Sequence, residues 1–306
     1  MNIKNIFITG INGFIGSNLN KYLVNQGYNV AGSVRKSENK LFVETGQLDN
    51  FDDWYECIGN SDIIIHCAAR VHQKNISIRD EQKCIAVNRD ATIKLAKAAK
   101  KRKVKKFIFI STIGVNGTSS KDNSFSANSP HDPQNSYSKS KSLAEAELID
   151  LCKNGPMELF ILRLPLVYGG DAPGNVSRLR NLIATGIPIP FKGIKNLKSF
   201  LHIDNLNSYI HSCFLTNTSK HLILFPSDKE DLSTSDFIRL LAKLDEKKLK
   251  LFWFFPMLIN FILNLMFQNK LANSLFENLL VSDHIDGQQI NFQPAFNPKK
   301  HIRERS

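Results

Sequence analysis

The chain has 306 residues, 42% of them hydrophobic, which is enough to bury a large core in one domain or in two interleaved ones. Its five cysteines form no C-x-x-C pair and its eight histidines form no H-E-x-x-H pattern, which argues against a metal site and favours reduced thiols. The formal net charge of +12 suits an anionic partner, but charge alone does not choose between a nucleotide-type ligand, an acidic membrane surface and nucleic acid.

The first apolar run, residues 3–9, predicts a buried strand and lacks the features of a signal peptide, so we expect a cytoplasmic protein. Three glycines, Gly10, Gly13 and Gly16, follow at once and open a helical pattern. In this context Gly10 permits a tight turn, Gly13 lets a pyrophosphate approach the backbone, and Gly16 lets helix and strand pack closely. The spacing therefore predicts a dinucleotide-binding site.

Further apolar runs predict buried strands that alternate with helices. The strands are residues 28–34, 63–69, 107–112 and 159–164, with a helix over 91–101. This alternation predicts an α/β fold with a doubly wound parallel sheet, the Rossmann fold. Glycines and prolines interrupt the pattern after residue 165. We expect a dinucleotide-binding domain over 1–165, with 196–216 returning to it, and a smaller, mixed substrate-binding region over 166–306.

Tyr137 and Lys141 stand four residues apart where a helix is expected to begin, so one helical turn brings them onto one face. A lysine beside a tyrosine favours the phenolate and would let it exchange a proton with a sugar hydroxyl near neutral pH. Taken alone, such a pair is more often a surface tyrosine and a solvated lysine. The chemical interpretation depends on the residues around it.

Two other stretches bear on partners. The basic run from Lys100 to Lys106 has no interleaved aromatic residues, which argues against nucleic acid, and we interpret it as a solvated helix end. The apolar residues 249–267 are interrupted by Pro256, Asn260 and Asn264, which favours a strand and a buried helix over a membrane span. Peripheral membrane contact stays open.

The segment Thr9-Gly10-Ile11-Asn12-Gly13-Phe14-Ile15-Gly16 resembles the T-G-x-x-G-F-I-G motif of the extended short-chain dehydrogenase/reductases, the NAD-dependent epimerase/dehydratase family. Further matches follow in the order of that family and extend to the end of the chain. They are His66-Cys67-Ala68-Ala69, Asn88, Thr112, Tyr137, Lys141, Arg163, Val167-Tyr168-Gly169 and Ile290-Asn291-Phe292-Gln293-Pro294.

The resemblance implies a role for each matching residue. Tyr137 would be the catalytic acid or base, Lys141 would tune it and hold the nicotinamide ribose, and Thr112 would hydrogen-bond the reacting oxygen. The implied cofactor-binding residues are Gly10, Gly13, Phe14, Ile15, Gly16, Arg35, Cys67, Ala68, Ala69, Asn88 and Lys141. The implied substrate-binding residues are Asn175, Arg180, Lys198 and His202. A UDP-sugar substrate and a homodimer formed through a pair of helices are implied in the same way.

Two departures from the family pattern bear on the reaction. Ile113 and Gly114 stand where related 4,6-dehydratases carry an Asp-Glu pair, so water elimination lacks its acid and base. Val34 stands where NAD-binding members have an acidic residue, and the next residue, Arg35, can pair with a 2′-phosphate. NADP therefore stays open beside NAD, and so does a merely solvated Arg35.

Residues 66–72, 113–117 and 231–234 most resemble a branch of bacterial surface-polysaccharide enzymes. That branch contains UDP-N-acetylquinovosamine dehydrogenases, which reduce a 4-keto sugar, and neighbours described as UDP-glucose 4-epimerases. We expect an NAD(P)-dependent 4-ketoreductase that acts on a UDP-linked N-acetyl (6-deoxy) hexosamine. The alternatives are a 4-epimerase with a retained NAD and, in another class, a non-catalytic dinucleotide-binding protein.

Overall fold

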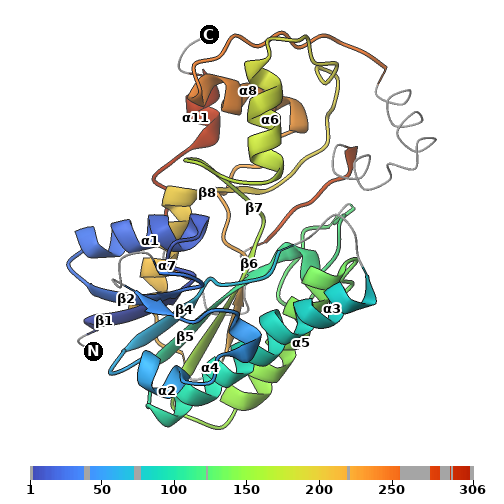
Figure 1. The fold of residues 1–306 in the computed structure, drawn as a ribbon. Coiled ribbons are helices and arrows are strands. Elements are labelled where there is room, and N and C mark those ends of the chain that lie inside the picture. Colours follow the sequence, from blue (N-terminus) through green and yellow to red (C-terminus); the bar gives the residue numbers. More distant parts are fainter. Residues whose placement is uncertain are drawn as a thin grey trace.

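A computed structural model describes residues 3–37, 42–71, 77–121, 123–218, 221–255, 276–282, 290 and 292–303. In it a large sheet, covered by helices on both faces, carries a smaller region at one end (Figure 1). Strand β6 (Glu158–Leu164) leads almost directly into β7 (Leu166–Tyr168) of the smaller region. The smaller region therefore lies beyond the carboxyl ends of the sheet strands.

The large sheet is parallel and has seven strands in the order β3-β2-β1-β4-β5-β6-β9. Besides β6, its strands are β1 (Asn5–Thr9), β2 (Asn29–Val34), β3 (Val43–Glu44), β4 (Ile63–His66), β5 (Lys106–Thr112) and β9 (Leu222–Leu224). The expected parallel Rossmann fold is confirmed. Strand order reverses between β1 and β4, and in such sheets ligands bind beside this switch point.

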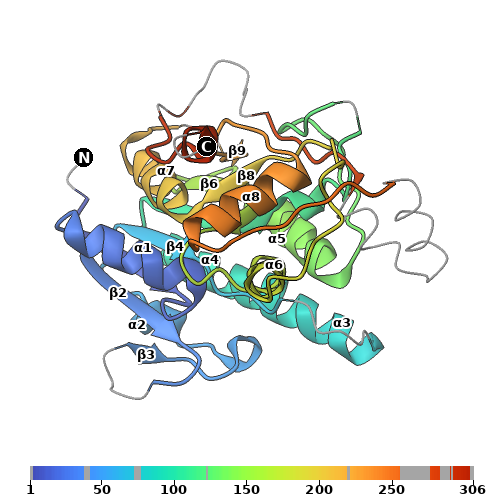
Figure 2. The same ribbon diagram turned by 90° about the horizontal axis from the view of Figure 1, so that it is seen from above.

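Alternation of side chains along the strands builds two cores. In β1, Ile6 and Ile8 face the core under α1 (Phe14–Asn25) and α7 (Ile203–Leu215), whereas Phe7 faces the opposite core. Helices α2 (Trp54–Cys57), α4 (Ala91–Lys101) and α5 (Ser136–Cys152) cover that second core. Figure 2 shows the sheet between these helix layers. Helix α3 (Ile78–Ile85) continues through the turn Ala86–Asp90 into α4.

The smaller region is built on a parallel pair, β7 and β8 (Phe200–His202). Its helices are α6 (Asn175–Ala184), α8 (Thr234–Leu244) and α11 (Pro298–Arg303). Phe200 and Phe237 stack in its core with their ring centres 3.9 Å apart. Ser233 caps α8 by accepting a hydrogen bond from the Asp236 N–H.

Three details differ from the sequence-based expectations. Lys106 is not solvated: it is buried, and its Nζ donates to Glu158 and to the Thr216 carbonyl. Strand β9 returns to the large sheet from beyond residue 216, which the apolar pattern did not indicate. Residues 252–255 are not buried, since the side chains of Trp253 and Phe255 are more than half exposed.

The rest of the predicted buried helix, 256–267, lies outside the described residues. Within the part of the chain that the structure describes, no helix is long and apolar enough to cross a membrane.

Candidate functional site

The three glycines form the turn from β1 to α1 that the sequence predicts. Gly10 has φ +65°, and a Cβ there would lie 3.0 Å from Ala68 Cα, so the loop after β4 rests directly on this turn. At Gly16 a Cβ would lie within 2.3 Å of the Gly10 carbonyl oxygen. Both positions require glycine, and α1 begins at Phe14 with its first N–H groups facing the loop. The cradle fits a pyrophosphate.

A buried hydrogen-bond chain fixes the loop that carries Cys67, Ala68 and Ala69. The Ala68 N–H donates to Thr9 Oγ1, which lies 2.6 Å from His66 Nδ1. His66 Nε2 lies 2.8 Å from Thr92 Oγ1, and Thr92 in turn donates to the Asn88 carbonyl.

These contacts fix the proton positions in the chain. Because the hydroxyl proton of Thr92 is committed to the Asn88 carbonyl, His66 must donate from Nε2 and accept at Nδ1 from Thr9. Burial, and next the charge of Lys141, lower the pKa of His66 to about 3, so the ring stays neutral. The motif that suggested a cofactor cleft thus has a neutral histidine at its base.

Asn88 is fully buried, and its amide is used by protein groups. Its Oδ1 accepts from the Arg70 N–H at 2.7 Å, and its Nδ2 donates to the Arg70 carbonyl and to Ser140 Oγ. Ser140 Oγ donates to the Tyr137 carbonyl. Asn88 therefore connects the loop after β4 to the first turn of α5. We interpret it as a residue that positions the site, which differs from the direct cofactor contact that the resemblance implies.

The proposed catalytic groups come from the carboxyl end of β5 and from the first two turns of α5. Asn135 caps α5 by accepting from the Ser138 N–H, which places Tyr137 in the first helical turn and Lys141 one turn later. Thr112 ends β5 and accepts from the Gly114 N–H at 3.1 Å, so its own hydroxyl proton can be offered to a substrate oxygen. A Cβ on Gly114 would lie 3.4 Å from Ser138 Cβ, which shows how closely this turn approaches α5.

Lys141 lies differently from the sequence-based expectation. Its Nζ donates to the Ile110 carbonyl at 2.7 Å and lies 6.0 Å from the centre of the Tyr137 ring. Burial lowers the pKa of Lys141 to about 8. Burial, and next the Cys84 thiol, raise the pKa of Tyr137 to about 12 instead of lowering it. With this pKa, the Tyr137 hydroxyl is protonated at neutral pH.

An ion pair behind these residues stabilises α5 against the sheet. Arg163 of β6 and Glu145 of α5 are both fully buried; the guanidinium donates to Glu145 Oε2 through Nε and Nη2, and Nε also donates to Oε1. Arg163 also donates to Asn116 Oδ1 at 3.0 Å. Ser111 donates to Glu145 through its hydroxyl. The sequence showed Arg163 only as a family match, although an arginine inside an apolar strand already signals a buried partner.

Three of the four predicted substrate residues lie at separate positions in the smaller region. Asn175 begins α6, next to Gly174, which has φ +71°. Arg180 contacts Asp245 and the Gly170 carbonyl, and the ring of His202 lies against Gly169, where a Cβ would be 2.4 Å from Nε2. The side chains of Arg180 and His202 are thus held by contacts within the protein.

Lys198, the fourth predicted substrate residue, is paired through its backbone with Leu232. Burial lowers the pKa of its ammonium group to about 8. The roles of these four residues in substrate binding stay predictions.

Sequence reasoning missed Asp228, which lies under His202. Its carboxylate accepts from the Tyr168 hydroxyl, the His202 N–H and Asn205 Nδ2. Burial, the largest influence, raises the pKa of Asp228 to about 6 although these hydrogen bonds act in the other direction. No short motif indicates this residue, because its partners come from two segments, Tyr168 and residues 202–205, that are distant from it in sequence.

Asp228→Asn is expected to change the pH dependence of stability. The pKa of a carboxyl rises from about 3.8 in the unfolded chain to about 6 in the folded protein, so the charged form destabilises the wild type above pH 6. The variant should therefore gain about 2 kcal/mol relative to the wild type between pH 4 and pH 8. Urea unfolding at both pH values measures this difference, and a difference that does not vary with pH contradicts the assignment.

Arg35 and Lys36 follow the last residue of β2 and are exposed, whereas Val34 is buried. No acidic side chain thus occupies the end of β2. Arg35 lies at the carboxyl end of the sheet, as the glycine turn after β1 does, and its exposed side chain could contact a bound cofactor there. Among the described residues no group of three or more His, Cys, Asp or Glu side chains is arranged to hold a metal ion.

Comparison with known proteins adds independent findings. A family profile described as "NAD dependent epimerase/dehydratase family" matches residues 6–220. A "UDP-glucose 4-epimerase" of Vibrio cholerae is 36% identical over 251 residues, covering 78% of this chain and 75% of that protein. An Escherichia coli O157:H7 protein, "N-acetyl-alpha-D-glucosaminyl-diphospho-ditrans,octacis-undecaprenol 4-epimerase", is 26% identical, covering 76% and 70%.

Among solved structures, the Bordetella bronchiseptica enzyme WbmG in complex with NAD and UDP superimposes with a TM-score of 0.75. It is 18% identical and covers 98% of this chain and 93% of its own. At that identity the likeness concerns the fold.

Proposed function

Because the chain belongs to the NAD-dependent epimerase/dehydratase family, we propose that it moves a hydride and a proton at carbon 4 of a UDP-linked N-acetylhexosamine, most simply as a 4-ketoreductase. It is a nucleotide-sugar enzyme of this family and uses NAD or NADP. The UDP-sugar as substrate, the surface-polysaccharide role and the homodimer remain predictions for this chain. The proposal is supported by Thr112 at the carboxyl end of β5 and by Tyr137 and Lys141 in the first two turns of α5, which packs against β5.

The residues of this chain supply the proton chemistry. The bound nicotinamide, when reduced, supplies a hydride to the carbonyl carbon. Tyr137, protonated at neutral pH, gives its hydroxyl proton to the carbonyl oxygen, and the C=O becomes a CH–OH. Thr112 offers a hydrogen bond to the same oxygen, and the ammonium group of Lys141 stabilises the phenolate that Tyr137 becomes. A proton from solvent then restores the phenol.

The same groups bear on the choice between reduction and dehydration. Reduction needs a proton donor, which the phenol of Tyr137 is, and in the reverse oxidation the phenolate of the same residue would act as the base. Elimination of water needs carboxylates where the chain has Ile113 and Gly114, and Glu145 is committed to Arg163. These observations support reduction over dehydration.

A 4-epimerase is the second candidate, and the 36% identity to a protein described as UDP-glucose 4-epimerase favours it. The two activities differ in nicotinamide balance, because a reductase consumes one reduced nicotinamide per sugar and an epimerase regenerates it. Purified protein incubated with a UDP-linked 4-keto N-acetylhexosamine and NADPH should consume reduced nicotinamide in a one-to-one ratio with product. Interconversion of UDP-sugars without any net consumption would decide for the epimerase.

Arg35→Glu is expected to change which nicotinamide is used. If Arg35 pairs with a 2′-phosphate, the reversed charge should raise KM for NADPH at least about tenfold, since a charge-assisted pair is replaced by repulsion. KM for NADH should change little or fall. Steady-state rates with both cofactors measure the ratio, and Lys21→Glu, on the exposed side of α1, is the matched control. Equal KM values before and after the change would show that Arg35 is a solvated strand end.

A further inference from the structure

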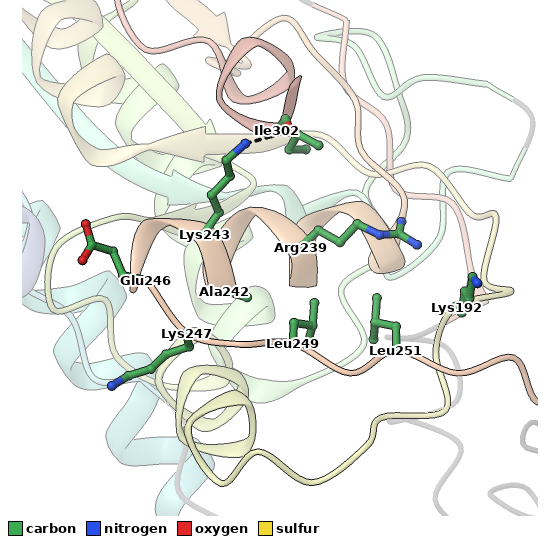
Figure 3. A pocket seen from close by; sticks show the side chains of 9 residues that line it. All are labelled: Lys192, Arg239, Ala242, Lys243, Glu246, Lys247, Leu249, Leu251 and Ile302. Atoms are coloured by element: carbon green, nitrogen blue, oxygen red, sulfur yellow. Dashed lines mark hydrogen bonds between the residues drawn. The ribbon is translucent and has the colours of Figure 1, made fainter. Parts of the chain in front are cut away.

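A basic cavity of about 760 Å³ lies on the outer side of the smaller region, between α8, α11 and the chain at residues 249–251 (Figure 3). Apolar side chains, among them Leu249, Leu251 and Ile302, form one part of its lining. The cationic residues of the lining are Lys192, Arg239, Lys243 and Lys247. The cavity combines a basic edge with an apolar floor.

Little of this positive charge is neutralised locally. Arg239 pairs with Asp236 at 2.7 Å, and Glu246 is the acidic residue in the lining. Lys243 donates to the carbonyl of Ile302, a neutral acceptor that leaves its charge in place. Lys248 and Lys250, which are exposed beside the cavity, add further positive charge. The face therefore attracts anions.

An exposed aromatic run continues directly from the cavity wall. Phe252, Trp253 and Phe255 are 43%, 55% and 60% exposed. The run has a fixed base, because the Phe252 N–H donates to the Ile189 carbonyl and the Lys192 N–H donates to the Phe252 carbonyl. Three exposed large aromatics within four residues are not a scattered surface feature, and clusters of this kind indicate an interaction site. None of them belongs to the catalytic machinery described above.

We propose that this face, Lys247 to Phe255 with the basic cavity, docks on the surface of an anionic phospholipid bilayer. Tryptophan and phenylalanine are suited to the headgroup level of a bilayer, and neighbouring lysines are attracted to anionic lipids. Charge complementarity and the aromatic run select a bilayer over a second copy of this basic chain. The proposal goes beyond the catalytic function, since the groups involved differ from those of the active site.

The two tryptophans of the chain make the test specific. Trp54 is 1% exposed in the sheet core, whereas Trp253 lies on the proposed face. With vesicles of phosphatidylcholine containing 30% phosphatidylglycerol, the full chain should sediment with the vesicles, and its emission should shift to the blue. Trp253→Phe should abolish the shift. Pure phosphatidylcholine vesicles should bind at least tenfold more weakly, and added salt should release the protein.

Charge variants distinguish vesicle binding through this face from vesicle binding through the overall positive charge of the protein. Lys247→Glu/Lys248→Glu should lower the vesicle partition coefficient at least tenfold. Lys21→Glu/Lys97→Glu, which changes the net charge equally on exposed positions of α1 and α4, should leave most of the binding intact. Both double variants should keep the activity on UDP-sugar in solution, so failure of docking and failure of the catalytic proposal are distinguishable.

Three results would overturn the docking proposal. These are equal binding of anionic and neutral vesicles, equal loss of binding in the two double variants, and an unchanged Trp253 emission on sedimented protein. A blue shift caused by inorganic phosphate alone, without vesicle binding, would assign the cavity to a small anion and would also contradict docking.

Discussion

Tyr137→Phe is expected to lower kcat by about 10²–10⁴-fold, because it removes the proton that the carbonyl oxygen needs as hydride arrives. KM for the nicotinamide and the thermal midpoint should change little, since the ring keeps its place in the first turn of α5. Steady-state kinetics with the 4-keto UDP-sugar measure the loss. Tyr55→Phe, in the short helix α2, removes the same hydroxyl away from the site and serves as the matched control.

The outcome that contradicts this role is specific. A Tyr137→Phe enzyme with kcat within a factor of three of the wild type would show that the proton comes from elsewhere. The catalytic roles of Thr112 and Lys141, which depend on Tyr137 as the proton donor, would then be contradicted as well. A loss of activity that coincides with a lower thermal midpoint would instead indicate misfolding, which the control variant and circular dichroism distinguish.

Arg163→Met is expected to lower the free energy of unfolding by about 3–5 kcal/mol, because it leaves the Glu145 carboxylate buried without its partner. The double variant Arg163→Met/Glu145→Gln should recover part of that loss, since an amide is less costly to bury than a charge. Urea unfolding of the wild type, both single variants and the double variant gives the coupling energy.

The double-mutant cycle shows whether Arg163 and Glu145 stabilise the protein through their ion pair. If the double variant were less stable than Arg163→Met by the full effect of Glu145→Gln, the two side chains would act independently, and the ion pair would not be what holds α5 on β5 and β6. Lys106→Met at the other end of β5 is a useful control, because it also breaks a buried pair, with Glu158, but far along the strand from Thr112.

Much of the fold was predictable because local patterns and the architecture agree. The glycine turn after β1 and the buried strands β4, β5 and β6 each follow from residues close together in the chain. Strand β9 has only three residues, so its apolar pattern carries little information. Its place in the sheet depends on the fold as a whole.

The electrostatic state of the site could not be predicted from spacing. The separation of Tyr137 and Lys141 predicts one helix face, but Lys141 is turned to the Ile110 carbonyl and Tyr137 is partly buried, and this desolvation reverses the expected direction of its pKa. Likewise, the neutral state of His66 depends on Thr9 and Thr92, which are far apart in sequence. Burial and long-range partners are tertiary properties.

The measurement that tests the central claim most directly uses NADPH deuterated at the transferable position and a UDP-linked 4-keto N-acetylhexosamine. We expect one deuterium at carbon 4 of each product sugar and one oxidised nicotinamide per product, with Tyr137→Phe lowering both together. Product without deuterium at carbon 4, or with deuterium at another carbon, would contradict the assignment of this site to hydride transfer at carbon 4.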